Sequence, residues 1–501
     1  MMERALSRIC AVLILFGFAS ASMVALAIDQ GVFSGYPCSR INAFTPNLLL
    51  SINDGVYGHH VEVSMAISDN GTLFAGWKNA DTHNGPGLRV SIAKSADGGA
   101  TWTQPFDMPM YGGAETEQSD PWLAWHDGTL YYAYLEVEVG YFDDPNSGLY
   151  FSQMTIAKST DYGDSWTLVK ATNATYFADK ETITVANDGT VYLVYDDVDV
   201  VDPAGNATVR LSVSTDGGET YNDTTVISED PGNLGPYVVT DSSGNIYVAW
   251  TWFGIDGGNL LFSKSVDGGL TFSDPAFIND DANSSASLPY GGRAGKVTLP
   301  VLRFDENDRL YVVWDDMFDT AGYTFDVYLR YSDDFGETWS NRIRVNPAVE
   351  DHQWNPEMAI DDEGVLHFAY YEEDGLMYRP NYRTLNFTGQ DRDTPDFSDA
   401  IAVADSYTSN EFTRPGEYLG LQLDGEGVPH VVWSDGRNEE MDIYYAHGLE
   451  TGITTTATST TSTSTTTTST TTDLPDYVLI ITVVVVVAVA IVAIVVIIRR
   501  R

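Results

Sequence analysis

A phrase of alternating apolar residues, repeated seven times, constrains the fold of this chain more than any other feature. Each copy has apolar residues at every second position, a polar turn rich in Gly and Asp, and a second apolar run that ends in Trp or Tyr. Alternation with a period of two on both sides of such a turn is typical of a β-hairpin. The aromatic residues that end the seven copies, 55 to 64 residues apart, are Trp77, Tyr134, Tyr195, Trp250, Trp314, Tyr370 and Trp433.

A second phrase follows each of the first five copies and has the form Ser-x-Asp-x-Gly-x-Thr/Ser-aromatic. An Asp carboxylate can accept backbone N–H bonds within a turn, and Gly can adopt the positive φ that such a turn needs. We therefore expect a tight turn that joins a second hairpin, with the aromatic residue packed against the neighbouring hairpin. The Asp residues of the five phrases are Asp97, Asp161, Asp216, Asp267 and Asp334.

Two hairpins in each repeat make four strands, and four-stranded repeats of this kind are the blades of a β-propeller. The sequence thus predicts an all-β fold, a seven-bladed β-propeller over residues 47–449. Six blades are the alternative, if one repeat is peripheral. The last repeat has only three strands, so we expect Asn47–Asn53 to supply the fourth strand and close the ring. Residues 28–46 remain as an N-terminal arm.

The two ends of the chain predict its topology. Residues 1–27 combine basic residues, an apolar run and small residues, which is the pattern of a secretory signal peptide. Residues 450–476 read as a Thr/Ser-rich stalk, and residues 477–498 as an uncharged transmembrane helix. Residues 499–501 are a basic cytoplasmic tail. We expect a single-pass protein of the cell membrane with its folded body outside the cell.

The charge of the chain excludes one class of partner and suggests a cofactor. It has 71 acidic residues against 26 Lys and Arg, a formal charge of −45, which argues against nucleic-acid binding because phosphates would be repelled. Many acids follow the aromatic residues that end the repeats. Crowded carboxylates either share a hard cation such as Ca²⁺ or form a solvated acidic surface, and both readings stay open. The acids selected for a Ca²⁺ site are Asp196, Asp197, Asp199, Asp315 and Asp316.

The five Ser-x-Asp-x-Gly phrases resemble the Asp-boxes, or BNR repeats, of the sialidase superfamily, over residues 47–449. The resemblance implies a propeller whose Asp-boxes lie on the face opposite the ligand site. It also implies a cluster of Arg for the substrate carboxylate, a Tyr nucleophile activated by Glu, and an acid/base carboxylate. The residues that could take these roles are Tyr418, Glu417, Arg414, Arg437, Arg293 and Glu181.

The sequence does not contain an evident arginine cluster, and two of these residues also have plainer roles. Arg437 can pair with Asp435 and hold the last blade, and Tyr418 can be a packing residue. We therefore expect a surface propeller that binds glycans, glycoproteins or a surface partner on the face opposite the Asp-boxes. An exo-sialidase or another glycoside hydrolase is the first alternative. A non-catalytic structural protein of the cell envelope is the second.

Overall fold

The structure is a computed structural model, and the chain divides into two compact units, Met1–Thr451 and Gly452–Arg501. All described residues belong to the first unit. They are residues 41–52, 56–82, 87–111, 116–138, 152–173, 177–199, 206–222, 225–230, 232–254, 257–279, 299–317, 324–347, 351–388, 394–409 and 418–450. None of these ranges contains a helix long and apolar enough to span a membrane. The predicted signal peptide, stalk, transmembrane helix and basic tail lie outside them.

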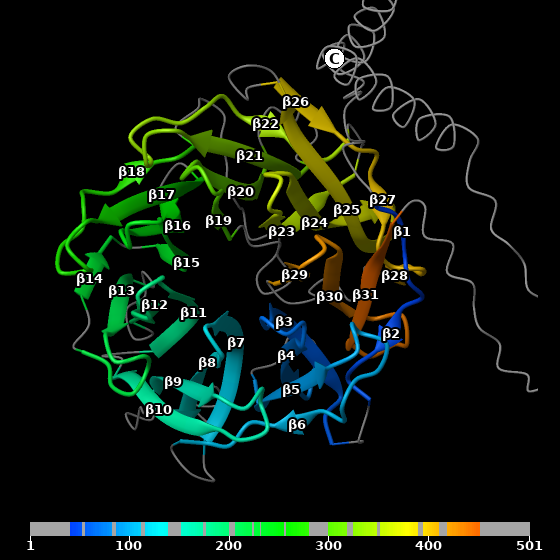
Figure 1. The fold of residues 1–501 in the computed structure, drawn as a ribbon, viewed down its shortest axis with the longest axis horizontal. Coiled ribbons are helices and arrows are strands. Elements are labelled where there is room, and N and C mark those ends of the chain that lie inside the picture. The colour runs from blue at the N-terminus through cyan, green and yellow to red at the C-terminus, as the bar shows by residue number, and fades with distance from the viewer. Residues whose placement is uncertain are drawn as a thin grey trace, which may run out of the picture. The chain divides into compact units, whose positions relative to one another are not determined.

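Seven antiparallel sheets, the blades, surround a central axis in the described part of the chain (Figure 1). The first strand of each blade contacts the first strands of both neighbours, so these inner strands surround the axis. The predicted seven-bladed β-propeller is therefore confirmed, and the alternative with six blades is wrong.

The first four blades have four strands each, in sequence order from the axis outward. Blade 1 contains β3 (His59–Ile67), β4 (Leu73–Ala80), β5 (Arg89–Ser95) and β6 (Phe106–Asp107). Blade 2 contains β7 (Thr116–His126), β8 (Thr129–Glu138), β9 (Ser152–Ser159) and β10 (Thr167–Asn173). Blade 3 contains β11 (Phe177–Val185), β12 (Val191–Val198), β13 (Ala207–Ser214) and β14 (Thr225–Ser228). Blade 4 contains β15 (Asn233–Thr240), β16 (Ile246–Gly254), β17 (Gly257–Ser265) and β18 (Ala276–Phe277).

Blade 5 also has four strands, whereas blades 6 and 7 carry additional short strands. Blade 5 contains β19 (Val301–Phe304), β20 (Leu310–Asp316), β21 (Asp326–Ser332) and β22 (Ile343–Arg344). Blade 6 contains β23 (Gln353–Ile360), β24 (Leu366–Asp374), β25 (Met377–Thr388) and β26 (Thr394–Phe397), with β27 (Ile401–Ala402) and β28 (Thr408–Ser409) also paired to β25. Blade 7 contains β29 (Gly420–Leu423), β30 (Pro429–Asp435) and β31 (Asp442–Glu450), together with β1 (Ile41–Phe44) and β2 (Leu48–Leu49).

The aromatic residues that end the seven repeated phrases are buried in the second strands of the blades. Each of them is at most 1% exposed. Large rings remove the most apolar area from water, so these positions contribute strongly to the packing of one blade on the next.

The five Asp-boxes join the third and fourth strands of blades 1 to 5. In blade 1, Asp97 Oδ1 accepts the backbone N–H of Thr101 at 2.8 Å, and Oδ2 accepts its hydroxyl at 2.6 Å. Hydrogen bonds from Thr101 and Ser95 lower the pKa of Asp97 to about 2. Equivalent bonds form at Asp161, Asp216, Asp267 and Asp334.

The glycine of the first Asp-box is required by its contact with the neighbouring blade. Gly99 has φ 89°, and a Cβ on it would lie only 1.9 Å from the Tyr445 hydroxyl of blade 7. Trp102 packs edge-on against the same tyrosine, with ring centroids 5.0 Å apart. The predicted packing of the box against a neighbouring hairpin is therefore confirmed here.

The Asp-boxes define one face of the ring. In blade 1, Ser95 at the start of the box pairs with Leu73, the residue that begins the second strand after its turn. The Asp-boxes and the turns between first and second strands therefore lie at the same end of the blades. We name this end the Asp-box face and the opposite end, where the inner strands begin, the top face.

The ring is closed in blade 7, where β1 and β2 both pair with β31 (Figure 1). The prediction that an N-terminal strand closes the ring is confirmed. Its position is only partly right, because β2 lies within Asn47–Asn53 whereas β1 lies in the segment assigned to the N-terminal arm. Pro46 lies between the two strands and has no N–H to donate to a ladder, which accounts for their separation.

Ring closure can be tested at Ile41, which is 7% exposed and packs in the core shared by blades 6 and 7. Replacing it by Ala removes buried apolar groups, so we expect the free energy of unfolding to fall by about 2–4 kcal/mol. Chemical denaturation of the full chain measures this. The control is Asn42→Ala, because Asn42 is exposed in the same strand. Equal stability of the two variants would show that β1 is not part of the cooperative ring.

Candidate functional site

The inner strands of five blades are interrupted at one equivalent place near the top face. In β3, β7, β11, β15 and β23 the register to the second strand shifts at a bulge. A positive φ is costly for residues other than glycine, and it persists only where the surrounding structure demands it. The residues with positive φ in these bulges, from 47° to 63°, are Glu62, Asp120, Lys180, Gly235 and Asn355.

Two buried ion pairs involve three of these bulge residues. Lys180 Nζ lies 2.7 Å from Asp120 Oδ2, which links blades 3 and 2, and Lys78 Nζ lies 2.6 Å from Glu62 Oε1 within blade 1. All four side chains are less than a tenth exposed. Burial alone would lower the pKa of Lys180, but the charge of Asp120 raises it well above its ordinary value. Lys180 is therefore a cation whose charge is already balanced.

The carboxyl groups on either side of Lys180 hold protons more readily than usual. Burial raises the pKa of Asp179 to about 6, with the charge of Asp120 adding to the effect and that of Lys180 opposing it. Burial also raises the pKa of Glu181 well above its ordinary value. Both oxygens of the Glu181 carboxyl lack a hydrogen-bond partner among the described residues. Burial therefore favours the protonated form of Glu181.

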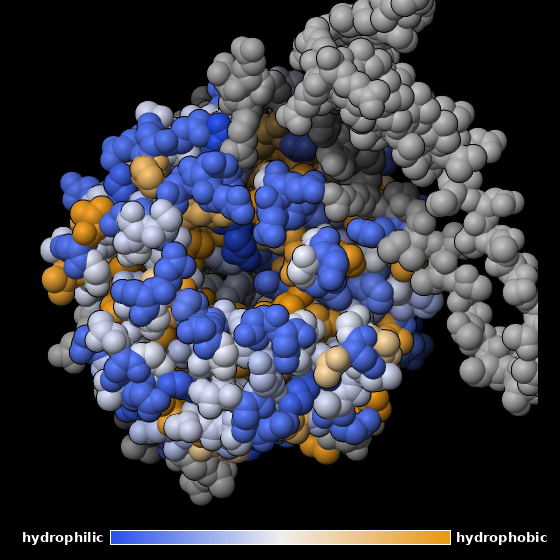
Figure 2. Space-filling model, viewed as in Figure 1, coloured by the Kyte–Doolittle hydropathy of each residue, from blue (hydrophilic) through white to orange (hydrophobic). Residues whose placement is uncertain are grey.

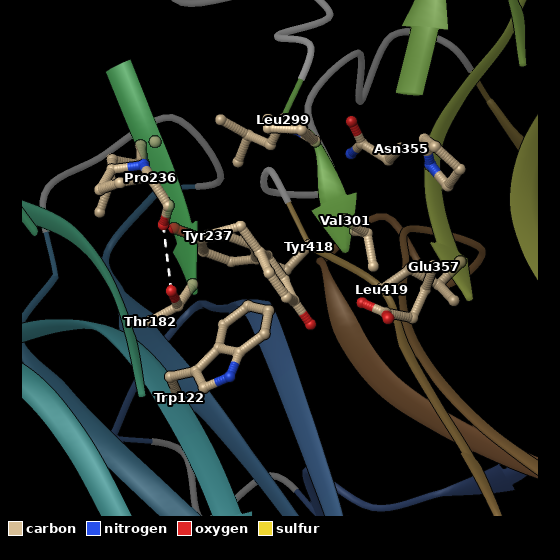
Figure 3. A pocket seen from close by; sticks show the side chains of 14 residues that line it. Trp122, Thr182, Pro236, Tyr237, Leu299, Val301, Asn355, Glu357, Tyr418 and Leu419 are labelled. Atoms are coloured by element: carbon tan, nitrogen blue, oxygen red, sulfur yellow. Dashed lines mark hydrogen bonds between the residues drawn. The ribbon is translucent and has the colours of Figure 1, made fainter. Parts of the chain in front are cut away.

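Three aromatic rings from three blades meet beside these charges (Figure 3). Trp122 of blade 2 lies between Tyr237 of blade 4 and Tyr418 of blade 7, with ring centroids 5.5 Å apart and edge-to-face geometry in both pairs. Lys180 Nζ lies 5.6 Å from the Tyr418 ring centroid, within reach of a cation–π contact. Burial raises the pKa of the Tyr418 phenol well above its ordinary value, so it keeps its proton.

An arginine from blade 5 lies beside these rings. The three rings, this arginine and the bulge residues form what we call the layer. Arg303 Nη1 donates to the Tyr237 hydroxyl, and its Nη2 lies 2.7 Å from Glu357 Oε1. Burial raises the pKa of Glu357 to about 7, although the charge of Arg303 opposes the shift. This carboxyl can therefore gain or lose a proton near neutral pH.

Two cavities on the axis share this layer as their common wall. Trp122, Tyr237, Glu357 and Leu419 line both of them. The upper cavity, on the side of Lys180 and the top face, has a volume of about 20 Å³. The lower cavity has a volume of about 280 Å³. In the space-filling view the ring has a central hollow surrounded by mostly hydrophilic residues (Figure 2).

The structure places three of the six residues selected for sialidase chemistry. Tyr418 lines the upper cavity, and Glu181 lies within electrostatic reach of its phenol. Arg437 lines neither cavity, because its Nη2 binds Asp435 at 2.6 Å and its Nη1 binds Asp405 at 2.6 Å. The predicted pairing with Asp435 is thus confirmed. The other three, Arg293, Arg414 and Glu417, lie outside the described residues.

The acids selected for Ca²⁺ are spread over two blades and engaged in protein contacts. Asp196 accepts the N–H of Gly235, and Asp197 binds Arg210 at 2.8 Å. In blade 5, Asp316 binds Arg342 at 3.0 Å. Asp315 accepts the N–H of Asn355, and Asp199 donates its own N–H to Asn206. The described ranges contain no group of three His, Cys, Asp or Glu residues that could hold a metal ion.

Several residues of the layer were not selected from the sequence. Lys180, Asp120 and Asn355 occupy bulges that the alternation of apolar residues does not reveal. One signal could have found two of them, because Asp120 and Asn355 directly precede prolines at the start of inner strands. A polar residue before proline recurs there because proline cannot continue the ladder.

One known protein family and several solved structures are similar to this chain. The family model of the BNR/Asp-box repeat matches residues 330–341, which include the fifth Asp-box. No curated protein sequence matches the chain. The chain thus carries a BNR/Asp-box repeat, and its fold is similar to that of solved sialidases and other propeller enzymes.

Three solved structures illustrate the likeness. A protein of unknown function from Dyadobacter fermentans has 17% identity and a TM-score of 0.47, over 66% of this chain and 94% of the other. An ulvan lyase, a polysaccharide lyase, has 10% identity and a TM-score of 0.48, over 77% and 94%. Trypanosoma rangeli sialidase has 11% identity and a TM-score of 0.47, over 81% and 58%.

The Lys180–Asp120 pair should be a major determinant of stability at the top of the axis. Lys180→Met leaves the Asp120 carboxylate buried without its cation, so we expect the free energy of unfolding to fall by about 3–5 kcal/mol. Adding Asp120→Asn should recover part of this loss. The control is Lys94→Met, whose partner Asp164 is exposed, and it should cost less than about 1 kcal/mol. Equal losses in the two single variants would contradict the assignment.

Glu357 should give the protein a distinctive pH dependence. Its pKa is about 7 in the folded protein against an ordinary 4.5, so the folded state binds more protons between these values. The free energy of unfolding should therefore fall as pH rises through this window, by up to roughly 3 kcal/mol from this group. Asp179 contributes in the same direction.

The measurement compares the wild-type chain with Glu357→Gln across the same pH range. The substitution should remove the contribution of this carboxyl from the slope, whatever it does to the stability at a single pH. Parallel curves for the two proteins would show that Glu357 has an ordinary pKa in the folded state.

Proposed function

We propose that this chain is a sialidase-like propeller that binds glycans at the top end of its axis, around Trp122, Tyr237 and Tyr418. The observation that carries the proposal is this group of three rings beside Lys180 and Asn355, which line the same cavity. Aromatic rings offer apolar faces to the C–H surfaces of sugars, and nearby polar groups can bind sugar hydroxyls. Apolar walls with a few convergent polar groups are typical of ligand sites.

The electrostatics of the site favour binding over a sialidase reaction. Arg303 is the only arginine that lines the axial cavities in the described part of the chain, and it is already bound by Glu357. Lys180 is balanced by Asp120 in the same way. A sialic acid carboxylate would therefore find no unpaired cation among the described residues that line these cavities, which supports recognition of sugars through rings and hydroxyls.

We also propose that the propeller is displayed on the outside of the cell. This rests on the sequence patterns of residues 1–27, 450–476 and 477–498, which predict secretion, a Thr/Ser stalk and a membrane anchor. A glycan site at the end of the propeller axis suits such a display, because extracellular glycans and glycoproteins are the partners found there.

Glycan binding is tested on a glycan array with the purified full chain and Trp122→Ala. Removing the central ring should lower the affinity for bound glycans by about tenfold or more, as expected when an aromatic anchor is lost. Trp252→Ala is the matched control, because Trp252 is a partly buried tryptophan that lines neither cavity. Unchanged binding by Trp122→Ala, or no binding by the folded wild-type chain, would contradict the proposal.

A glycoside hydrolase is the second candidate, and the protonation of two carboxyl groups favours it. Asp179 and Glu357 have pKa values of about 6 and about 7, and so can act as proton donors near neutral pH. Asp179 lies within electrostatic reach of Lys180 and Asp120, and Glu357 lies 2.7 Å from Arg303. A raised carboxyl pKa is typical of the general acid of a glycosidase.

The hydrolase is tested with fluorogenic sialosides and neutral glycosides. If the reaction uses Tyr418 as its nucleophile, Tyr418→Phe abolishes turnover while the exposed control Tyr111→Phe retains it. Turnover that survives Tyr418→Phe would exclude this residue as the nucleophile. Absence of turnover across the panel would leave glycan binding as the function.

A further inference from the structure

The lower cavity lies on the Asp-box side of the ring and is lined by residues that the structure describes. Its lining reaches Ile67, Trp125 and Gln422, which stand within one residue of the ends of their inner strands. It therefore extends from the aromatic layer toward the turns of the Asp-box face. Its volume of about 280 Å³ is close to the lower limit of about 300 Å³ for small-molecule sites.

Two polar groups in the wall of this cavity have unused hydrogen-bonding capacity. Glu357 is 6% exposed, and both hydrogen bonds that it accepts, from Arg303 and from Met358 N–H, go to Oε1. Its Oε2 has no partner among the described residues. The indole N–H of Trp122 likewise has none. A carboxylate oxygen and an indole N–H in the wall of a cavity are available to bind water or a ligand there.

The side chains nearer the Asp-box face are polar and neutral. Thr184 of blade 3 and Gln422 of blade 7 are partly exposed, and neither makes a side-chain hydrogen bond to another described residue. A hydroxyl and an amide can each donate and accept. The wall thus presents donors and acceptors at both ends, with the Trp122 ring between them as an apolar surface.

The charge of the cavity restricts the class of ligand. Arg303 and Glu357 are the only charged residues in its lining, and they pair with each other at 2.7 Å. An anion would approach Glu357 and meet an arginine already bound by Glu357, Tyr237 and the Leu302 carbonyl. A metal cation would find one carboxylate, which is too few for a hard cation.

We propose that the lower cavity is a second binding site, which takes one neutral sugar ring or a similar polyol from the Asp-box face. Hydroxyl groups of such a ligand donate to Glu357 Oε2 and accept from the Trp122 N–H. Its C–H face packs on the Trp122 ring, and its outer hydroxyls contact Thr184 and Gln422. This site shares the Trp122 ring with the glycan site proposed at the top face, whereas Thr184 and Gln422 line the lower cavity alone.

The test uses equilibrium dialysis of the full chain with radiolabelled D-galactose and D-glucose, and with D-glucuronate as a charged counterpart. The chain is kept in a detergent without a sugar headgroup, which would compete. Thr184→Phe and Gln422→Trp fill the cavity from two blades, and neither residue lines the upper cavity. We expect each to lower the affinity for a neutral sugar by about tenfold or more.

Two further variants keep the result interpretable. Thr184→Ser retains the hydroxyl without added bulk, so it should bind sugar nearly as well as the wild-type chain. Thr240→Phe adds the same bulk near the end of another inner strand, outside the cavity lining, and should leave binding unchanged. Thermal unfolding of each variant establishes that it is folded.

The outcomes separate this proposal from the one for the top face. Neutral-sugar binding that is lost in both filling variants, but kept in Thr184→Ser and Thr240→Phe, supports the lower site, whereas the same filling variants should leave binding at the top face unchanged. Binding that survives both filling variants places the sugar elsewhere and overturns the proposal. Tighter binding of D-glucuronate than of the neutral sugars, or no binding by the folded wild-type chain, also overturns it.

Discussion

The whole structure depends on closing a ring of sheets without leaving an edge. Each blade buries its two faces against its neighbours, so a blade lacking its outer strand would expose both a sheet edge and core residues. β1 and β2 supply that edge to β31. Arg437 holds the junction from the side, because it binds Asp435 and Asp405, donates to Asn47 and covers the Tyr444 ring at 4.2 Å. The predicted ion pair between Arg437 and Asp435 thus lies at the closure of the ring.

Near the axis, three largely buried cations each pair with one of the chain's many carboxylates. Lys78, Lys180 and Arg303 are bound by Glu62, Asp120 and Glu357 in blades 1, 2 and 6. Buried charges are tolerated only when compensated in this way. Burial also raises the pKa of Asp179 and of Glu181, on either side of Lys180, and so favours their protonated forms. Each of the three ion pairs adds no net charge to the axis.

The fold could be predicted from the sequence almost completely, whereas the site could be predicted only in part. Hairpins have a local signature, since alternation and turn residues lie within about fifteen positions. The Asp120–Lys180 contact joins residues 60 positions apart, and each partner is oriented by a bulge that interrupts the alternation. Tyr418 was found because it stands where an inner strand begins. Trp122 was overlooked because it matches the repeat like any packing residue.

The closing strands also determine how the propeller resists a mechanical force applied along its chain. The chain leaves blade 7 at the end of β31, a strand that is hydrogen-bonded to β30 on one side and to β1 and β2 on the other. Its last three residues, Gly448 to Glu450, pair with β1 alone. Tension applied beyond Glu450 acts along β31 and loads its ladders together in shear. The N-terminal strands β1 and β2 would separate from β31 first. The strands that close the ring are therefore also the part of the ring that resists force least.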